Sequence, residues 1–133
     1  MNTYLLDTNI VSLLLRRHVP AEQKLEAILA LNAIIVLSPV VFYEVYRGLF
    51  KRDSKNQMAF LEQLFPKFIW ANLIQEDWHR AAQLWAERER LGKPISDTDL
   101  LIAVQAERLD TILVTDNEKD FDGLGVRVEN WKR

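Results

Sequence analysis

The sequence predicts a single α/β domain over residues 1–133, with a mostly parallel sheet of about four to five strands flanked by helices. Short uncharged runs rich in β-branched residues alternate with longer amphipathic runs, which is typical of βαβ units. A chain of 133 residues has room for one hydrophobic core. Hydrophobic residues make up 49% of the chain, and Gly and Pro number only 4 each, as in packed globular proteins.

The predicted strands are short apolar segments without charges, each followed by polar or capping residues. The first is expected directly after the N-terminus, and the segment ending at Val114-Thr115 is the clearest of the later ones. Because helical patterns separate most of these segments, we expect them to pair in parallel. The expected strands cover residues 3–6, 33–37, 68–70, 111–115 and 126–128.

The predicted helices begin at capping residues or at proline and end before glycine or proline. Ser38-Pro39 and Ser96 are typical N-terminal signals, and Gly92 is a typical C-terminal signal. Residues 51–57 are polar and indicate a loop or a helix bend. The expected helices cover residues 10–15, a segment from 20, 38–50, 58–64, 76–91 and a segment from 96.

Composition excludes several classes of function. The absence of Cys excludes disulfides, thiolate zinc sites and cysteine nucleophiles, and two histidines make a His-rich metal site or a Ser-His-Asp triad hard to assemble. A net charge of −2 excludes a strongly basic nucleic-acid-binding protein. The uncharged segment 27–43 is shorter than a spanning helix, and no signal peptide is recognisable. We therefore expect a cytoplasmic protein with no membrane partner.

Acidic residues follow the predicted strands or begin the predicted helices. Because the carboxyl ends of parallel strands meet at one edge of a sheet, side chains far apart in sequence can converge there. Gathered carboxylates repel, by roughly 3 kcal/mol per pair at ~5 Å in a medium of effective dielectric near 20. A proton or a divalent cation has to offset this repulsion, and an all-oxygen site selects Mg²⁺ or Mn²⁺. The candidates are Asp7, Glu44, Asp97, Asp99, Asp116 and the neighbouring Asn117.

Each acid also has a purely structural interpretation. A strand-ending Asp is a common N-cap, Ser-x-x-Asp fits a capping box, and Glu and Arg three residues apart form surface pairs on helices. These interpretations apply to Asp7, to Ser96 with Asp99, to Glu44 with Arg47, and to a turn at Asp116-Asn117.

Aromatic and basic residues give weaker indications. Trp70, Trp78, Trp85 and Trp131 are expected in the core or in an interface, because Trp78 and Trp85 lie two helical turns apart on one face. A further set of basic residues is equally well a rim for a phosphate backbone or a solvated surface. This set comprises Arg16, Arg17, His18, Arg47, Lys51, Arg52 and Lys55.

Five motifs in register resemble those of one known family, the PIN-domain ribonucleases of the VapC toxin type. The resemblance runs nearly from end to end of the chain. It is carried by Leu5-Leu6-Asp7-Thr8-Asn9, Ser38-Pro39 through Glu44 with Gly48, Gly92-Lys93-Pro94-Ile95 through Asp99 to Ala103, Leu113 through Asn117 to Phe121, and Glu129-Asn130-Trp131.

The resemblance implies a Mg²⁺- or Mn²⁺-dependent endoribonuclease. It assigns the first three acids of the family to Asp7, Glu44 and Asp99, with the metal held by Asp7 and Asp99. The fourth position is Asn117, where many relatives carry Asp, so a second metal site is in question. The neighbouring acids Asp97 and Asp116 partly replace it, and Thr8, Asn9 and Thr115 are expected to supply supporting hydrogen bonds.

The resemblance also implies partners. The substrate is RNA, with tRNA and rRNA as the expected classes, and a small VapB-type antitoxin inhibits the enzyme. Family members form homodimers through helices of the first half of the chain, and the antitoxin tail often places an Arg against the acids. The residues expected to line its groove, some of which fit core packing equally well, are Leu13, Leu14, Phe42, Tyr46, Leu49 and Phe50.

Other functions fit less well. A phosphatase of the haloacid dehalogenase type needs a second Asp two residues after the first, and Asn9 stands there. A response-regulator receiver needs paired acids near its first strand, which are absent. A PIN-like module that binds a partner protein or RNA without cleaving it remains the alternative, since Asn117 adds no charge to the site.

Overall fold

The computed structural model describes residues 2–133 and contains one parallel five-stranded sheet. The strand order is β3-β2-β1-β4-β5, and every neighbouring pair is parallel, as the sequence predicts. Each strand lies within a predicted segment or overlaps it by two residues. The strands are β1 (Thr3–Leu6), β2 (Ile34–Leu37), β3 (Ile69–Trp70), β4 (Ile112–Val114) and β5 (Arg127–Glu129).

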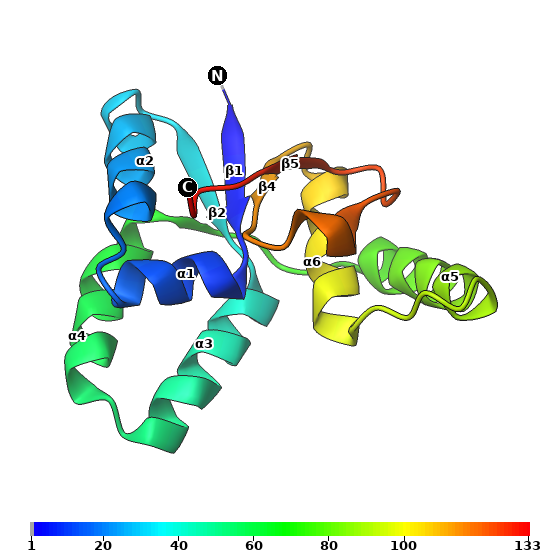
Figure 1. Ribbon diagram of the computed structural model, residues 1–133, viewed down its shortest axis with the longest axis horizontal. Helices are drawn as coiled ribbons and strands as arrows, with labels where there is room; N and C mark the ends of the chain where they lie inside the picture. The colour runs from blue at the N-terminus through cyan, green and yellow to red at the C-terminus, as the bar shows by residue number, and fades with distance from the viewer. Residues whose placement is uncertain (1) are drawn as a thin grey trace.

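Six α-helices within the described residues connect and cover the strands. Figure 1 shows α1 and α3 near one end of β1, and α5 on the outer side of α6. No helix in this part of the chain is both long and apolar enough to cross a bilayer. The helices are α1 (Thr8–Leu15), α2 (Val19–Ala30), α3 (Pro39–Arg52), α4 (Lys55–Leu64), α5 (Gln75–Arg90) and α6 (Asp97–Arg108), and two 3₁₀ turns cover Phe65–Lys67 and Glu118–Phe121.

The polar segment 51–57 is more helical than its composition predicts. Helix α3 continues to Arg52, and α4 begins at Lys55. The break is confined to Asp53 and Ser54, where Asp53 adopts a left-handed conformation with φ of 50°. Asp tolerates this conformation better than most residues, so a single residue ends α3 and a long loop is not needed.

The order of the strands places a topological switch point between β1 and β4. From β1 the chain builds outward through β2 to β3, and it then returns to add β4 and β5 on the other side of β1. The backbone N–H of Asp7, directly after β1, donates to the Val114 carbonyl of β4 at 2.9 Å. Parallel α/β sheets bind their ligands in the crevice at this point, so the fold itself marks where a site is expected.

The core decides between several of the alternatives that the sequence left open. Trp131 is fully buried against Tyr4, with ring centroids 6.0 Å apart, as expected for a core residue. Trp78 and Trp85 are 55% and 47% exposed, so neither belongs to the core, and the interface that the sequence analysis allowed for them stays a prediction. Three residues expected to line a partner groove, Leu13, Leu14 and Leu49, are buried and belong to the core.

A buried ion pair fastens α5 to α6. The Asp77 side chain is only 1% exposed, and Arg108 donates to both of its oxygens, at 2.8 and 3.0 Å. Asp77 also accepts from the backbone N–H of Ile74 and so caps α5. Loss of the guanidinium would therefore leave a buried carboxylate without its cation.

We expect Arg108→Ala to lower the free energy of unfolding by about 3 kcal/mol, because it leaves the buried charge of Asp77 without a cation. Urea denaturation at neutral pH measures this change. The matched control is Arg127→Ala, which removes an arginine from the exposed pair with Asp110 and is expected to cost less than about 1 kcal/mol. Equal losses in the two variants would contradict the stabilising role of the buried pair.

Candidate active site

Asp7 occupies the centre of the switch point and is buried, with 5% of its surface exposed. Its Oδ1 accepts from the backbone N–H of Ile10 at 2.9 Å, so Asp7 is the N-cap of α1, as the structural interpretation predicts. Burial raises the pKa of Asp7 to about 7. The neighbouring Thr115 side chain and the Ile10 N–H oppose this rise, whereas the charges of Asp116 and Asp99 add to it.

Glu44 faces the start of α1 from the second turn of α3. The Thr8 hydroxyl donates to Glu44 Oε1 at 2.6 Å, which links the residue after Asp7 to the second predicted acid. Arg47 lies near the other oxygen, with its Nη2 3.6 Å from Glu44 Oε2. The surface pair expected between Glu44 and Arg47 is thus present. The shorter contact, however, is the one that holds Glu44 toward the sheet edge.

Asp99 lies in the first turn of α6, behind an N-cap that the sequence predicted. The Ser96 hydroxyl oxygen accepts from the Asp99 backbone N–H at 3.2 Å. Burial is the main cause that raises the pKa of Asp99 above its usual value, and the charges of Asp120 and Glu44 raise it further, against a lowering contribution from Ser96. Asp99 therefore lies within electrostatic reach of acids from two other segments.

The segment after β4 contributes a second group of polar side chains. Asn9 Nδ2 donates to Asp116 Oδ1 at 3.3 Å, and this bond joins the start of α1 to the end of β4. The buried Thr115 hydroxyl accepts from the Asn117 backbone N–H at 3.0 Å. Asn117 uses its side-chain amide to donate to Asp120 Oδ2. The three expected supporting residues therefore all make hydrogen bonds at this edge of the sheet. Thr8 binds Glu44, Asn9 binds Asp116, and Thr115 binds the backbone of Asn117.

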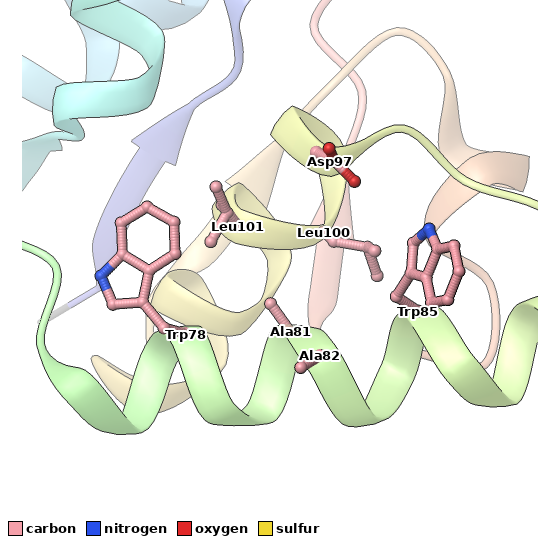
Figure 2. Close-up of a pocket in the computed structure, with 7 residues that line it drawn as sticks. All are labelled: Trp78, Ala81, Ala82, Trp85, Asp97, Leu100 and Leu101. Atoms are coloured by element: carbon pink, nitrogen blue, oxygen red, sulfur yellow. The ribbon is translucent and has the colours of Figure 1, made fainter.

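Asp97 lies apart from this group. It lines a mostly apolar groove of about 530 Å³ between α5 and α6, and Figure 2 shows its carboxylate above Leu100, on the side of the groove away from α5. The two half-exposed indoles of Trp78 and Trp85 flank the groove, with Ala81 and Ala82 between them. Asp97 is not among the charges that raise the pKa of Asp7 or Asp99.

Asp120 is a candidate site residue that the sequence analysis did not predict. It lies in the 3₁₀ turn Glu118–Phe121, where its charge acts on Asp99 and its carboxylate accepts from Asn117. The available signal was its spacing of three residues after Asn117, about one helical turn, in a segment whose helical character was not predicted.

Charge coupling connects the acids into one cluster, the acid cluster, of Asp7, Glu44, Asp99, Asp116 and Asp120. Within residues 2–133, no three acids or histidines lie close enough to form a ready-made metal site. Mg²⁺ typically uses only one or two protein carboxylates and keeps several waters, so the pair Asp7 and Asp99 fits such an ion by donor type. Carboxylate, hydroxyl and amide oxygens also suit a hard cation and do not suit a soft one.

The chain is similar over nearly its whole length to proteins of one known family. Residues 4–126 match the model of the PIN domain family. The chain is 30% identical over 132 residues to "Ribonuclease VapC2" of Rickettsia felis, covering 98% of each protein. It is 24% identical to "tRNA(fMet)-specific endonuclease VapC" of Shigella flexneri, covering 98% of this chain and 99% of that protein.

A solved structure matches closely in fold. The crystal structure of VapBC2 from Rickettsia felis, bound to a DNA fragment from its promoter, superposes with a TM-score of 0.86 at 29% identity. The match covers 97% of this chain and 98% of that chain. Together with the five motifs and the acid cluster at the switch point, these matches show that the chain belongs to the PIN-domain family of VapC ribonucleases.

Proposed function

We propose that this chain is the toxin of a type II toxin–antitoxin pair and acts in the cytoplasm as a Mg²⁺- or Mn²⁺-dependent endoribonuclease. The observation that carries the proposal is the convergence of Asp7, Glu44 and Asp99 on the switch point from three separate segments. Burying a carboxyl and surrounding it with like charges destabilises the ionised form. A bound divalent cation would offset that cost, and this is the expected reason for such an arrangement.

Asp7 and Asp99 are the residues proposed to hold the cation. When bound, a divalent ion of this kind activates water as a nucleophile and neutralises charge on a phosphoryl group. The protein's part is to keep its carboxylates oriented: the Ile10 N–H fixes Asp7, Ser96 caps the turn that carries Asp99, and Thr8 fixes Glu44. Glu44, held with Oε1 on Thr8, would orient the attacking water for in-line approach to phosphorus.

The proposed reaction is hydrolysis of a phosphodiester bond. Water supplies the oxygen that attacks phosphorus, and the ribose 3′-oxygen leaves, which gives 5′-phosphate and 3′-hydroxyl ends. Because the 2′-hydroxyl takes no part, preference for RNA has to come from shape and from contacts to that hydroxyl. We propose tRNA or rRNA as the substrate class. The similarity to a relative named as tRNA-specific over nearly the whole chain supports tRNA first.

A small VapB-type antitoxin is the proposed protein partner, and a homodimer is the proposed assembly of the toxin. Structural neighbours named as VapBC complexes support the first of these. Aromatic residues on α3 and β3 form a partly exposed apolar surface. The Phe42 ring packs tilted against Tyr46 and edge-on against Trp70, and Phe50 is 68% exposed. An arginine from the antitoxin would find several carboxylates in the acid cluster to pair with.

We expect Asp7→Asn and Asp99→Asn each to reduce RNA cleavage at least about a hundredfold, because each removes a carboxylate proposed to hold the cation. The measurement is the rate of 5′-phosphate end formation on total RNA with Mg²⁺ or Mn²⁺, and with EDTA as a blank. Asp110→Asn serves as the control, since Asp110 is exposed at the opposite edge of the sheet. Full activity of Asp7→Asn would refute the assignment.

Stability should depend on pH through Asp7. The folded protein holds the Asp7 proton up to a pH of about 7, whereas the unfolded chain releases it near 3.8, so stability falls as pH rises between these values. Above pH 7 the ionised carboxylate costs on the order of 4 kcal/mol. Asp7→Asn should remove this pH dependence in urea titrations between pH 4 and pH 8.

Thermal unfolding of the same two proteins tests cation binding without any RNA. At pH 8, adding Mg²⁺ should raise the Tm of the unsubstituted protein, because the ion stabilises ionised Asp7 in the folded state only. It should leave the Tm of Asp7→Asn nearly unchanged. A Mg²⁺ response of equal size in both proteins would contradict binding at Asp7.

We expect Asn117→Asp to keep or raise the cleavage rate at saturating Mg²⁺, because a carboxylate there faces Asp120 and adds charge that a cation can use. Asp120→Asn should weaken Mg²⁺ affinity about tenfold, as is typical for residues that support metal ligands. Cleavage rates measured across a Mg²⁺ titration report both effects. An inactive Asn117→Asp, or an Asp120→Asn with unchanged Mg²⁺ dependence, would argue against a role for this turn.

A further inference from the structure

Arg47 is the cation that contacts the acid cluster. Among the ion pairs within residues 2–133, the pair with Glu44 is the only one that involves a member of this cluster. The contact is single and long, with 3.6 Å between Arg47 Nη2 and Glu44 Oε2, and the Arg47 side chain is 54% exposed. A monodentate pair at such an exposed position contributes little to stability.

Glu44 does not depend on Arg47 for its orientation. The Thr8 hydroxyl holds Oε1 of Glu44 at 2.6 Å, and the Glu44 side chain is only 16% exposed, whereas the guanidinium lies toward solvent. By contrast, Arg108 donates to both oxygens of Asp77, and that carboxylate is buried. Arg47 therefore has the geometry of a side chain available for another anion.

Tyr43 makes a cation–π contact with Arg47. The guanidinium carbon of Arg47 lies 5.0 Å from the centre of the Tyr43 ring. Tyr43 lies one helical turn before Arg47 on α3 and is 59% exposed. A cation–π contact attracts the guanidinium to the ring without occupying a hydrogen-bond acceptor, so the N–H donors of Arg47 can still bind an anion. The pair thus presents a positively charged, partly immobilised donor group beside Glu44.

The substrate class makes a cation at this position useful. An RNA strand that reaches the acid cluster brings phosphate charges toward several carboxylates, which repel it. Arginine binds phosphate oxygens with paired N–H donors, and it can exchange the single long contact to Glu44 for a shorter one to phosphate. No other basic side chain is ion-paired with the acid cluster in the described part of the chain.

We propose that Arg47, supported by Tyr43, binds a backbone phosphate of the RNA strand next to the scissile bond. The inference rests on the proposed ribonuclease function and adds a substrate-binding residue to it. In the free protein the guanidinium rests on Glu44 Oε2. On RNA binding it moves to the phosphate, while Thr8 keeps Glu44 in place.

The test separates binding from cleavage. The probe is a fluorescein-labelled single-stranded RNA of mixed sequence, titrated against Asp7→Asn protein so that the strand stays intact. Fluorescence anisotropy gives the Kd at several KCl concentrations for Asp7→Asn alone and with Arg47→Gln, Tyr43→Ala, Tyr43→Phe or Arg127→Gln added. Arg127 is the matched control, since it is 58% exposed, forms one carboxylate pair and lies at the opposite edge of the sheet.

Arg47→Gln should weaken RNA binding about tenfold, the effect of one charge-assisted hydrogen bond. It should also lower the slope of log Kd against log salt concentration by about 0.7, the value for one phosphate contact on a single strand. Tyr43→Ala should weaken binding about threefold through loss of the cation–π support, and Tyr43→Phe should restore it. Arg127→Gln should bind as the Asp7→Asn protein does.

Cleavage assays complete the test in proteins that retain Asp7. Arg47→Gln should raise KM and leave kcat nearly unchanged, whereas an arginine that only positions Glu44 would lower kcat. Equal Kd and salt slope for Arg47→Gln and Arg127→Gln, or no RNA binding by any variant, would overturn the proposal. Arg47-dependent binding combined with no cleavage by the unsubstituted chain would overturn the proposed function and leave the phosphate contact supported.

Discussion

The buried carboxyl of Asp7 is the constraint on which the active-site region depends. It ends β1, caps α1 and lies at the switch point of the sheet, so its backbone and side-chain roles cannot be separated. As a cap it stabilises the fold, and as an ion it destabilises the fold, because burial and the charges of Asp116 and Asp99 raise its pKa to about 7. The fold keeps it buried, and a bound cation would remove the cost.

Short polar residues from the neighbouring segments hold the acid cluster together. Thr8 orients Glu44, Asn9 binds Asp116, and Ser96 caps the turn that carries Asp99. Each is either an N-terminal helix residue or lies next to one, where backbone N–H groups and the helix dipole favour negative charge. The same local rule that starts these helices therefore also lowers the cost of bringing the carboxylates to one edge of the sheet.

Features that depend on neighbours in sequence could be predicted, and features set by packing between distant elements could not. Strand ends and N-caps place Asp7 and Asp99 correctly, because both follow from short-range signals. Asp120 was missed because it acts from a 3₁₀ turn without an apolar repeat. Trp78 and Trp85 share a helix face, as predicted, yet periodicity cannot reveal that α5 packs mainly on α6 and leaves that face half exposed.

One charge cluster can serve opposite purposes because different cations would compete for it. In the proposed function a divalent ion on Asp7 and Asp99 enables hydrolysis, while an antitoxin guanidinium at the same carboxylates would block it. Arg47 already places a guanidinium beside Glu44, but its long contact and exposed position make that contact easy to exchange for a phosphate. An inhibitory arginine would have to bind more tightly than Arg47 does, and the burial of Asp7 favours a partner that excludes water from the cluster.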